Sequence, residues 1–283
     1  MTEVKLRKSP AKFSIPKISS NVWKVWRRNA AVFTKTVGVN FFPSMLEPIL
    51  YLFAFGIGLG GFISQINGTA YINFIAPALV AISLMNGAFF ECTYGSFVRM
   101  YFQKTFDAIV ATPISIEEVV AGELLWGATR GTINCTIVLI VIGISGFFTP
   151  QPLISSPLFL LMPIIAFFSG LMLASIAMCF TAVSPNIDFF NYPIFLFITP
   201  MLFLSGTFFP LSSLPATAQG IAIAALPLTH VVNLTRGALT GSTEIIFGLN
   251  TQTLIPLSLL WIAIIAIVFF ILSINLMKKR LIR

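Results

Sequence analysis

The chain has 283 residues, of which 57% are hydrophobic and only 9% are charged, and its mean hydropathy is +0.95. Soluble domains carry roughly 25% charged residues, so this composition excludes a soluble globular protein and indicates a membrane protein. The net charge is +8, but nine of the 17 Lys and Arg residues lie in the first 35 positions and four more lie in the last six. This distribution excludes nucleic acid as a partner, because a nucleic-acid site needs basic and aromatic residues together on a soluble surface.

Residues 1–40 are basic and contain no apolar run long enough for a signal peptide, so we expect the N-terminus to stay in the cytoplasm. From Ser20 onward, Trp23 and Trp26 fall on one face of a helix, and Lys24 and Arg27 fall on the other. This pattern predicts an interfacial helix with indole rings among the lipid headgroups and basic residues over anionic lipid. We therefore separate a basic tail with an interfacial helix, residues 1–40, from a transmembrane domain, residues 41–283.

Six apolar runs follow, and each has the roughly 20 residues that a helix needs to cross about 30 Å of hydrocarbon. They lie at about residues 41–63, 72–97, 124–148, 158–182, 189–210 and 254–277. With the N-terminus inside, the inner segments carry nine basic residues before the first span, two in the loop after the second span and four at the C-terminus. The outer segments carry only Arg236. This bias predicts an all-α membrane protein with six transmembrane helices and both termini in the cytoplasm.

Residues 99–130 form the long polar interruption between the second and third spans. Phe102, Phe106 and Ile109 recur at helical spacing with Asp107 on the opposite side, which predicts a short amphipathic helix that stops before Pro113. A second helix is expected to begin at residue 116 and to run without a break into the third span.

The start of that second helix carries its own signal. Ser115 and Glu118 have the spacing of a capping box, and Ile114 and Val119 have that of a hydrophobic staple. Short helix, fixed corner and long helix together predict a rigid cytoplasmic unit on which a partner can act. The alternative is an ordinary helix-loop-helix lying on the bilayer surface.

Three charged residues lie inside the predicted spans at a similar depth. Glu47, Glu91 and Arg130 are each about six residues from the cytoplasmic end of their span, which is a depth of roughly 9 Å. An isolated charge in a membrane helix costs on the order of 3 kcal/mol, so such residues usually pair. We predict that Arg130 pairs with Glu91, Glu47 or both. The pair either fastens the spans together or transmits motion to a gate, and the competing interpretation is that Arg130 extends to the headgroups.

Residues 206–250 precede the last span and are nearly free of charge. Pro210, Pro215 and Pro227 divide their apolar stretches into pieces too short to cross a membrane. We expect two short re-entrant helices in the outer leaflet, where surrounding protein satisfies the backbone. The alternative is a plain extracytoplasmic loop.

Enzymatic chemistry is missing from the sequence. No Gly-Lys pair occurs, so a phosphate-binding P-loop is excluded. The chain has one histidine, His230, and three cysteines without CxxC spacing, so no catalytic set and no metal site is expected. Glu117, Glu118 and Glu123 are interpreted as helix-start residues that favour the dipole. The energy source must therefore be a separate motor subunit or an ion gradient, and the second would favour inverted repeats with broken helices in both halves.

Aromatic side chains are abundant, with 29 phenylalanines. Five aromatic residues in the first and fifth spans are candidates to line a path for a glycan or acyl chain: Tyr51, Phe53, Phe55, Tyr192 and Phe195. The alternative is that these rings face lipid or neighbouring helices.

One joint pattern of residues carries a family resemblance. It consists of Glu91, Tyr94, Phe97, Arg99-Met100, Gln103, Thr105, Ala108-Ile109, Pro113, Gly122-Glu123 and Trp126, followed by Thr199-Pro200-Met201, Leu204-Ser205-Gly206, Phe209-Pro210, Leu214-Pro215, Leu226-Pro227-Leu228 and His230. Over roughly residues 21–280 the chain resembles the nodulation protein J group of ABC transporter type-2 permeases.

The resemblance implies a homodimer of six-span subunits in the bacterial inner membrane, docked on two copies of a separate subunit that binds ATP and Mg²⁺. It implies that the loop between the second and third spans is the ATPase-coupling site, with candidate residues Phe102, Phe106, Asp107, Ile109, Glu117 and Glu118. It also implies outward transport of a lipid-linked or acylated saccharide. Related permeases with the same architecture export drugs or polysaccharides, since a fold does not fix the substrate.

Overall fold

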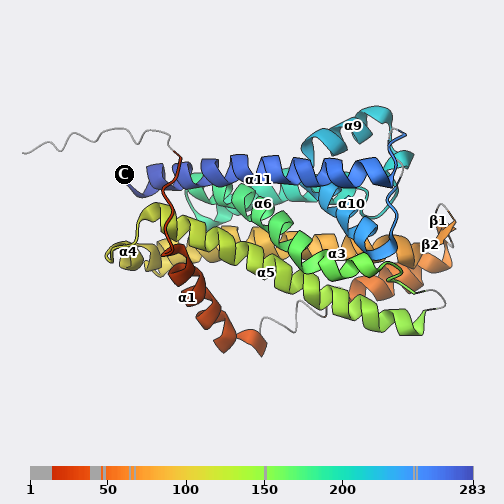
Figure 1. Ribbon diagram of the computed structural model, residues 1–283, viewed down its shortest axis with the longest axis horizontal. Coiled ribbons are helices and arrows are strands. Elements are labelled where there is room, and N and C mark those ends of the chain that lie inside the picture. The colour runs from red at the N-terminus through yellow and green to blue at the C-terminus, as the bar shows by residue number, and fades with distance from the viewer. Residues whose placement is uncertain are drawn as a thin grey trace, which may run out of the picture.

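Long helices run side by side along the bundle, with the C-terminus and α4 at one end and α9 and a small β-ribbon at the other (Figure 1). The computed structural model describes residues 15–38, 46, 49–63, 65–66, 68–149, 152–244, 246 and 248–282. Below, the two ends of the bundle are called the α4 end and the α9 end, and η marks short 3-10 or π-helical turns. In chain order the elements are α1 (Val22–Lys35), η1 (Leu52–Gly58), η2 (Leu59–Gly61), β1 (Gln65–Ile66), β2 (Thr69–Ala70), α3 (Tyr71–Phe90), η3 (Glu91–Gly95), η4 (Val98–Phe102), α4 (Thr105–Val110), α5 (Ile116–Ser145), η5 (Gly146–Phe148), η6 (Pro157–Leu161), α6 (Met162–Val183), η7 (Ile187–Phe190), α7 (Asn191–Pro193), η8 (Ile194–Ile198), α8 (Thr199–Leu204), η9 (Leu211–Ser213), α9 (Ala216–Ala225), α10 (Pro227–Thr240) and α11 (Thr251–Leu281).

Five helical stretches among the described residues are long and apolar enough to cross a bilayer. They are Tyr71–Phe102, Ile116–Phe148, Pro157–Val183, Ile187–Leu204 and Thr251–Leu281. These stretches match the second to sixth predicted spans. The first predicted span, 41–63, begins in residues that lie outside the described ranges, and its described part contains η1 and η2. The chain is thus an all-α membrane protein, and its two short strands form one antiparallel pair with Gln65 opposite Ala70.

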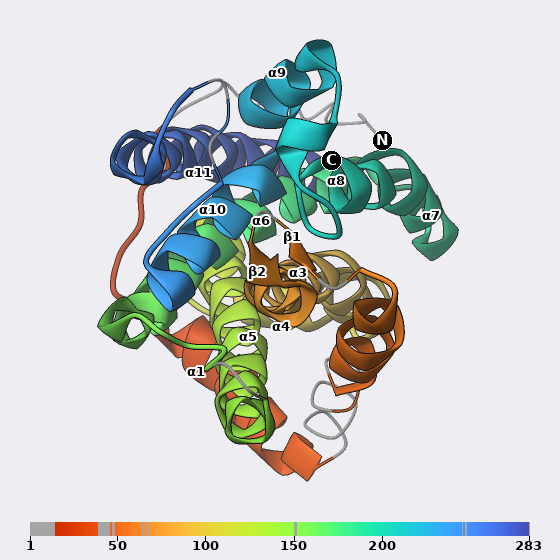
Figure 2. The same ribbon diagram turned by 90° about the vertical axis from the view of Figure 1, so that its right-hand side faces the viewer.

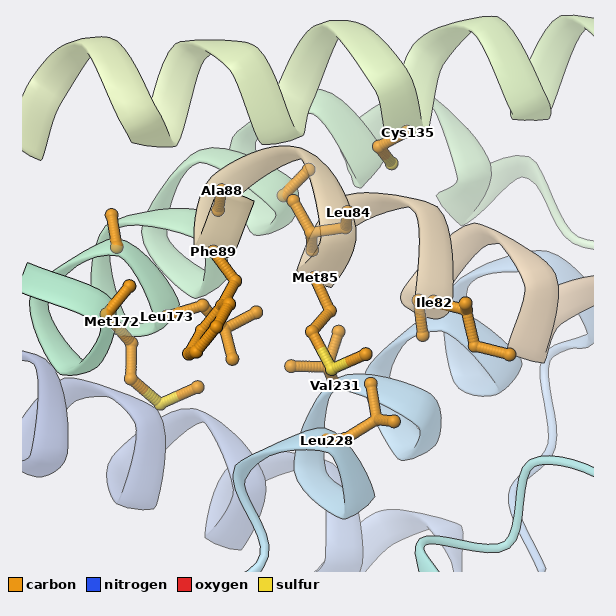
Figure 3. Packing of buried hydrophobic residues seen from close by; sticks show 14 of the residues in the cluster. Ile82, Leu84, Met85, Ala88, Phe89, Cys135, Met172, Leu173, Leu228 and Val231 are labelled. Carbon is orange, nitrogen blue, oxygen red and sulfur yellow. The ribbon is translucent and has the colours of Figure 1, made fainter. Parts of the chain in front are cut away.

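The core is built around α3, which contacts α5, α6 and α10 (Figure 2). Leu84, Met85 and Phe89 on α3 are at most 1% exposed and pack against Leu173 on α6 and Val231 on α10 (Figure 3). Lipid tails are as apolar as these side chains, so close van der Waals packing holds such helices together. Close packing of the α3 side chains therefore positions α5, α6 and α10.

Small residues allow the central helices to approach closely. A Cβ on Gly131 of α5 would lie 2.9 Å from the Leu84 carbonyl oxygen of α3, and a Cβ on Gly170 of α6 would lie 3.1 Å from the Ala128 carbonyl oxygen of α5. Both glycines lie where two helix backbones cross, which is the usual place of small residues in membrane bundles.

The segment before the last span forms two short helices, as its prolines predict. α9 and α10 meet at a bend of 89°. Pro215 precedes α9 and Pro227 is the first residue of α10, a position where the missing amide hydrogen is not needed. Gly241 ends α10 with φ of +75°, a conformation that favours glycine.

His230 fastens this bent pair to the last span. Its Nε2 lies 2.8 Å from the Ile223 carbonyl oxygen of α9, so Nε2 carries the hydrogen and donates. The free Nδ1 then accepts from the Ser258 hydroxyl of α11 at 3.1 Å. The ring stacks on Trp261 of α11 with centroids 4.3 Å apart. One buried, fully satisfied imidazole therefore connects α9, α10 and α11.

Candidate functional site

Four charged residues meet at the α4 end, between the extension of α3 and the first turns of α5. They are Glu91, Arg99, Glu123 and Arg130, called the ion cluster below. Their side chains are between 1% and 15% exposed. Charges this well removed from water are stable only when paired and hydrogen-bonded. The arrangement of partners in the ion cluster therefore controls the stability of this end of the bundle.

Glu123 is the most deeply buried member of the ion cluster. One of its oxygens accepts from Arg99 Nε at 2.9 Å, from Arg99 Nη2 at 2.6 Å and from the Ser96 hydroxyl at 2.8 Å. Its other oxygen accepts from Asn29 Nδ2 of α1 at 2.7 Å. The prediction that Glu123 serves the helix start was wrong, because this carboxylate is fully buried and joins three segments. The contact between Arg99 and Glu123 was not predicted.

Two arginine side chains pair with the Glu91 carboxylate. Arg99 Nη1 lies 2.7 Å from one oxygen and Arg130 Nε lies 3.4 Å from the other, while Trp126 Nε1 donates at 3.0 Å. The predicted pairing of Arg130 with Glu91 is confirmed. The third member of the predicted charge set, Glu47, lies outside the described residues.

Arg99 was missed as a site residue, because we counted it as a basic residue of the loop and otherwise named it only within the family pattern. It lies eight positions after Glu91, and a straight α-helix would rise about 12 Å over that distance. Helical side chains lean toward the N-terminus, so a long arginine can reach back. The backbone between them also contains the π-helical turns η3 and η4, which often occur at functional sites. A charge next to an apolar run was the one available signal.

α1 packs on α5, so it does more than lie at the membrane surface. Trp26 Nε1 donates to the Thr129 hydroxyl at 2.9 Å, and Val25 is buried. Gly122 of α5 permits this contact, because a Cβ there would lie 2.6 Å from the Val25 Cβ. The interfacial position of this helix stays a prediction, to which the structure adds a packed face. Its packed face includes Val25 and Asn29, whereas only Trp23 keeps a largely exposed indole, 59%.

The predicted amphipathic helix begins later than expected. Lys104 has φ of +54°, a left-handed conformation that ends the extension of α3 and turns the chain into α4. Phe102 therefore belongs to η4, not to α4, and its side chain is 61% exposed. Phe106 is 1% exposed and packs into the core of this chain, so it is unavailable to a partner in this conformation.

The outward surface at this end is both apolar and polar. Tyr101, Phe102 and Val110 are exposed large apolar residues, called the exposed apolar surface below. Asp107 is exposed beside them, and Ile109 is half-buried. Exposed apolar side chains that gather at one end of a bundle are typical of contact sites for protein or membrane.

Glu117 and Glu118 bind to other segments of the same chain. The capping box is confirmed, because the Ser115 hydroxyl accepts from the Glu118 amide and the Glu118 carboxylate accepts from the Ser115 amide at 2.7 Å. Glu118 also accepts from the Ser19 hydroxyl. Glu117 accepts from the Lys17 amide at 2.6 Å and pairs with Lys278 Nζ of α11 at 2.5 Å. These acids therefore join the N-terminal segment, the start of α5 and the end of the last span.

The five candidate path aromatics do not share one environment. Tyr51 stacks on Phe55 with centroids 5.7 Å apart, and Phe55 contacts Phe208 at 5.4 Å. In contrast, Phe53, Tyr192 and Phe195 are each at least 63% exposed. The second group lies on the outside of this subunit, where lipid or a second subunit would cover it.

A cavity of about 380 Å³ opens beside the ion cluster. Arg28 of α1, Arg99 and Arg130 line it together with Glu91 and the ring of Trp126. Burial lowers the pKa of the Arg28 guanidinium, and the nearby Glu123 opposes that shift. Arg130 also lies over the Phe33 ring, with its Cζ 4.5 Å from the ring centroid. Three guanidinium groups and the Glu91 carboxylate line this cavity, and with the Glu123 carboxylate that binds Arg99 they leave one net positive charge.

The chain belongs to the ABC-2 type transporter family, whose pattern matches residues 20–240, and it is therefore the permease subunit of a transporter. It is similar to nodulation protein J of Rhizobium meliloti (strain 1021), at 34% identity over 95% of this chain and 98% of that protein. Nodulation protein J of Rhizobium leguminosarum bv. viciae is 34% identical, with the same coverage. The inner membrane transport permease YadH of Escherichia coli (strain K12) is 27% identical over 70% of this chain and 75% of that protein.

Proposed function

We propose that this permease moves a lipid-linked or acylated saccharide outward across a bacterial inner membrane, as a homodimer powered by two copies of an ATP-binding subunit. The absence of a P-loop from the sequence supports a separate motor. The basic residues before the first span and after the last span support cytoplasmic termini. Similarity to nodulation protein J supports an exporter of this kind.

One observation carries the proposal, namely that the α4 end is fastened into a single unit. The ion cluster connects the extension of α3 with α5 and α1. Glu117 connects the start of α5 with α11. A partner that pushes on the exposed apolar surface would therefore move several helices at once. Such coupling between a docked subunit and a path through the bundle is what an ATP-driven exporter requires.

The cavity beside the ion cluster supports an amphiphile with a polar head as the substrate. Its guanidinium groups can donate hydrogen bonds to the oxygens of a saccharide, or of a phosphate that links a saccharide to a lipid. Its location at the predicted headgroup depth would let a lipid-linked molecule enter from the inner leaflet with its acyl chain still in the membrane.

The test uses inside-out membrane vesicles that contain the permease and its ATP-binding subunit, and follows uptake of a fluorescent N-acylated chitotetraose. We expect uptake with ATP and none with a non-hydrolysable analogue. Uptake driven by an imposed ion gradient without ATP would identify a secondary transporter and overturn the proposal. ATP-driven uptake of a drug dye or a polysaccharide, but not of the acylated probe, would keep the exporter and reject the proposed substrate.

A further inference from the structure

A second cavity, of about 630 Å³, lies at the α9 end, which is the opposite end of the bundle from the ion cluster. It is bordered by the β-ribbon, the start of α3, the end of α10 and the segment after α10. Its lining includes Phe74, Arg236 and Glu244, together with a set of serine and threonine hydroxyls. Its volume is in the range of roughly 300–1,000 Å³ that small-molecule sites occupy.

Arg236 lines this cavity, and its guanidinium is held in place by neighbouring groups. Its Nη2 donates to the Gly206 carbonyl oxygen at 2.6 Å, and its Cζ lies 4.0 Å from the Phe74 ring centroid. The side chain is only 6% exposed, yet its Nε has no hydrogen-bond partner among the described residues. A buried donor without a partner is costly and uncommon, so this guanidinium keeps one donor unsatisfied among the described residues.

Glu244 determines which charge a ligand in this cavity can carry. One of its oxygens lies 3.4 Å from Arg236 Nη1, and the other accepts from the Ser212 amide at 3.0 Å and from the Ser212 hydroxyl at 2.9 Å. The cation and the anion cancel, so the cavity has no net charge. A phosphate would be repelled by Glu244 and an amine by Arg236.

Hydroxyl groups make up most of the remaining polar lining. Thr69, Ser155, Thr240, Ser242 and Thr243 each contribute one, and Ser212 adds another. Several of these hydroxyls already donate to backbone carbonyls, for example Thr240 to the Arg236 carbonyl at 2.8 Å, so their oxygens are left to accept. Many weak donors and acceptors around a neutral ion pair fit a ligand with many hydroxyls of its own.

We infer that this cavity is a binding site for a neutral saccharide unit, with Arg236 and Glu244 as its principal hydrogen-bonding groups. The inference rests on the proposed function in one respect, since the saccharide would be the glycan part of the exported molecule as it leaves at the outer face. The binding itself requires neither ATP nor a partner subunit.

The test measures protection of a cysteine in the cavity. Native Cys92, Cys135 and Cys179 are replaced by alanine, and Ser242→Cys is introduced as the reporter. Ser213→Cys is the matched control, because Ser213 is also exposed, lies at the same end and does not line the cavity. Labelling by a membrane-impermeant maleimide is timed on the purified full-length permease in nanodiscs, with and without chitotetraose or maltotetraose.

We expect at least one of the two saccharides to slow labelling of the Ser242→Cys variant several-fold and to leave the Ser213→Cys variant unchanged. Adding Glu244→Gln should abolish that protection while the protein stays monodisperse. No protection by either saccharide, protection by inorganic phosphate instead, or equal protection at both positions would overturn the site. Ser155→Cys serves as a second reporter in the cavity if Ser242→Cys fails to fold.

This result is separable from the transport assay. If the saccharide protects the cavity but ATP-driven uptake fails, the site stands and the proposed function falls. If uptake succeeds without protection, the function stands and the site falls.

Discussion

Arg99 donates to two carboxylates on different helices, to Glu91 on its own helical extension at 2.7 Å and to Glu123 on α5 at 2.6 Å. Arg130, the cation that the sequence pointed to, makes the longer of the two contacts with Glu91, at 3.4 Å. Arg99 is therefore the central cation of the ion cluster, and Arg130 lies at its edge over the Phe33 ring.

The first prediction compares these two arginines. Arg99→Gln should destabilise the permease by about 3–5 kcal/mol, because it leaves the buried Glu123 carboxylate without its cation. Arg130→Gln should cost clearly less, since Glu91 keeps Arg99. Thermal unfolding of the detergent-purified protein, followed by fluorescence-detected size exclusion, measures both effects.

Arg27→Gln is the control for that comparison, because Arg27 lies on the exposed face of α1 and no ion pair joins it among the described residues. Equal losses for Arg99→Gln and Arg130→Gln would contradict the central role of Arg99. A charge reversal at Glu91 and Arg130 is a poor test of their pairing, because the new arginine at 91 would face Arg99.

The second prediction separates the two phenylalanines at the α4 end. Phe102→Asp should leave the permease folded but reduce binding of the ATP-binding subunit, because Phe102 is exposed and its described ring contacts are with Phe97 and Tyr101 of the same helical segment. Phe106→Asp should instead lower the yield of folded protein, since it places a charge in the core. Co-purification of the two subunits and the monodisperse yield of the permease give the two readouts. Normal subunit binding and transport by Phe102→Asp would remove the exposed apolar surface from the docking site.

The third prediction concerns the contact between α1 and α5. Gly122→Ala should push α1 away, because the added Cβ would lie 2.6 Å from the Val25 Cβ. Overpacking of this kind costs about 1–3 kcal/mol. Limited trypsin digestion should then cut faster at Lys24 and Arg27. The second change Val25→Ala should restore resistance, and Gly220→Ala, which meets nothing within 4 Å, should have no effect. Failure of Val25→Ala to rescue would show that α1 is held elsewhere.

The fourth prediction concerns His230. His230→Leu removes the donor to the Ile223 carbonyl and the acceptor for the Ser258 hydroxyl, and each buried group left unsatisfied costs about 1–3 kcal/mol. The melting temperature should fall, and α9 should lose its attachment to α10. Trp261→Phe keeps an aromatic ring for the stacking contact and should have a smaller effect. A His230→Leu variant as stable as the wild type would show that the hydrogen bonds of this imidazole contribute little.

Patterns confined to one stretch of chain were predicted well. The spans from residue 71 onward, the capping box at Ser115 and the bent pair before α11 follow from hydrophobic length, a local spacing and the positions of proline. The Arg130–Glu91 pair could also be predicted, because both charges lie at one depth in apolar helices and charges at one depth have few other partners.

Contacts between distant segments could not be predicted in the same way. The role of Glu123 depends on Arg99 and Asn29, which come from two other segments, and a single sequence contains no signal that joins them. Lys104 was equally hidden, because lysine rarely adopts a positive φ and nothing around it marks a turn. The burial of Phe106 follows from that turn.

The partners of α1 lie far along the chain, and this sets an order of assembly. Trp26 bonds to Thr129, Asn29 to Glu123 and Ser19 to Glu118, all about a hundred residues later. A ribosome adds roughly 5–20 residues per second, so α1 emerges about 5 to 20 seconds before α5. During that interval its tryptophans and basic residues suit it to rest among the lipid headgroups. We therefore expect α1 to lie among the headgroups until α5 has been made, and to pack against α5 afterwards.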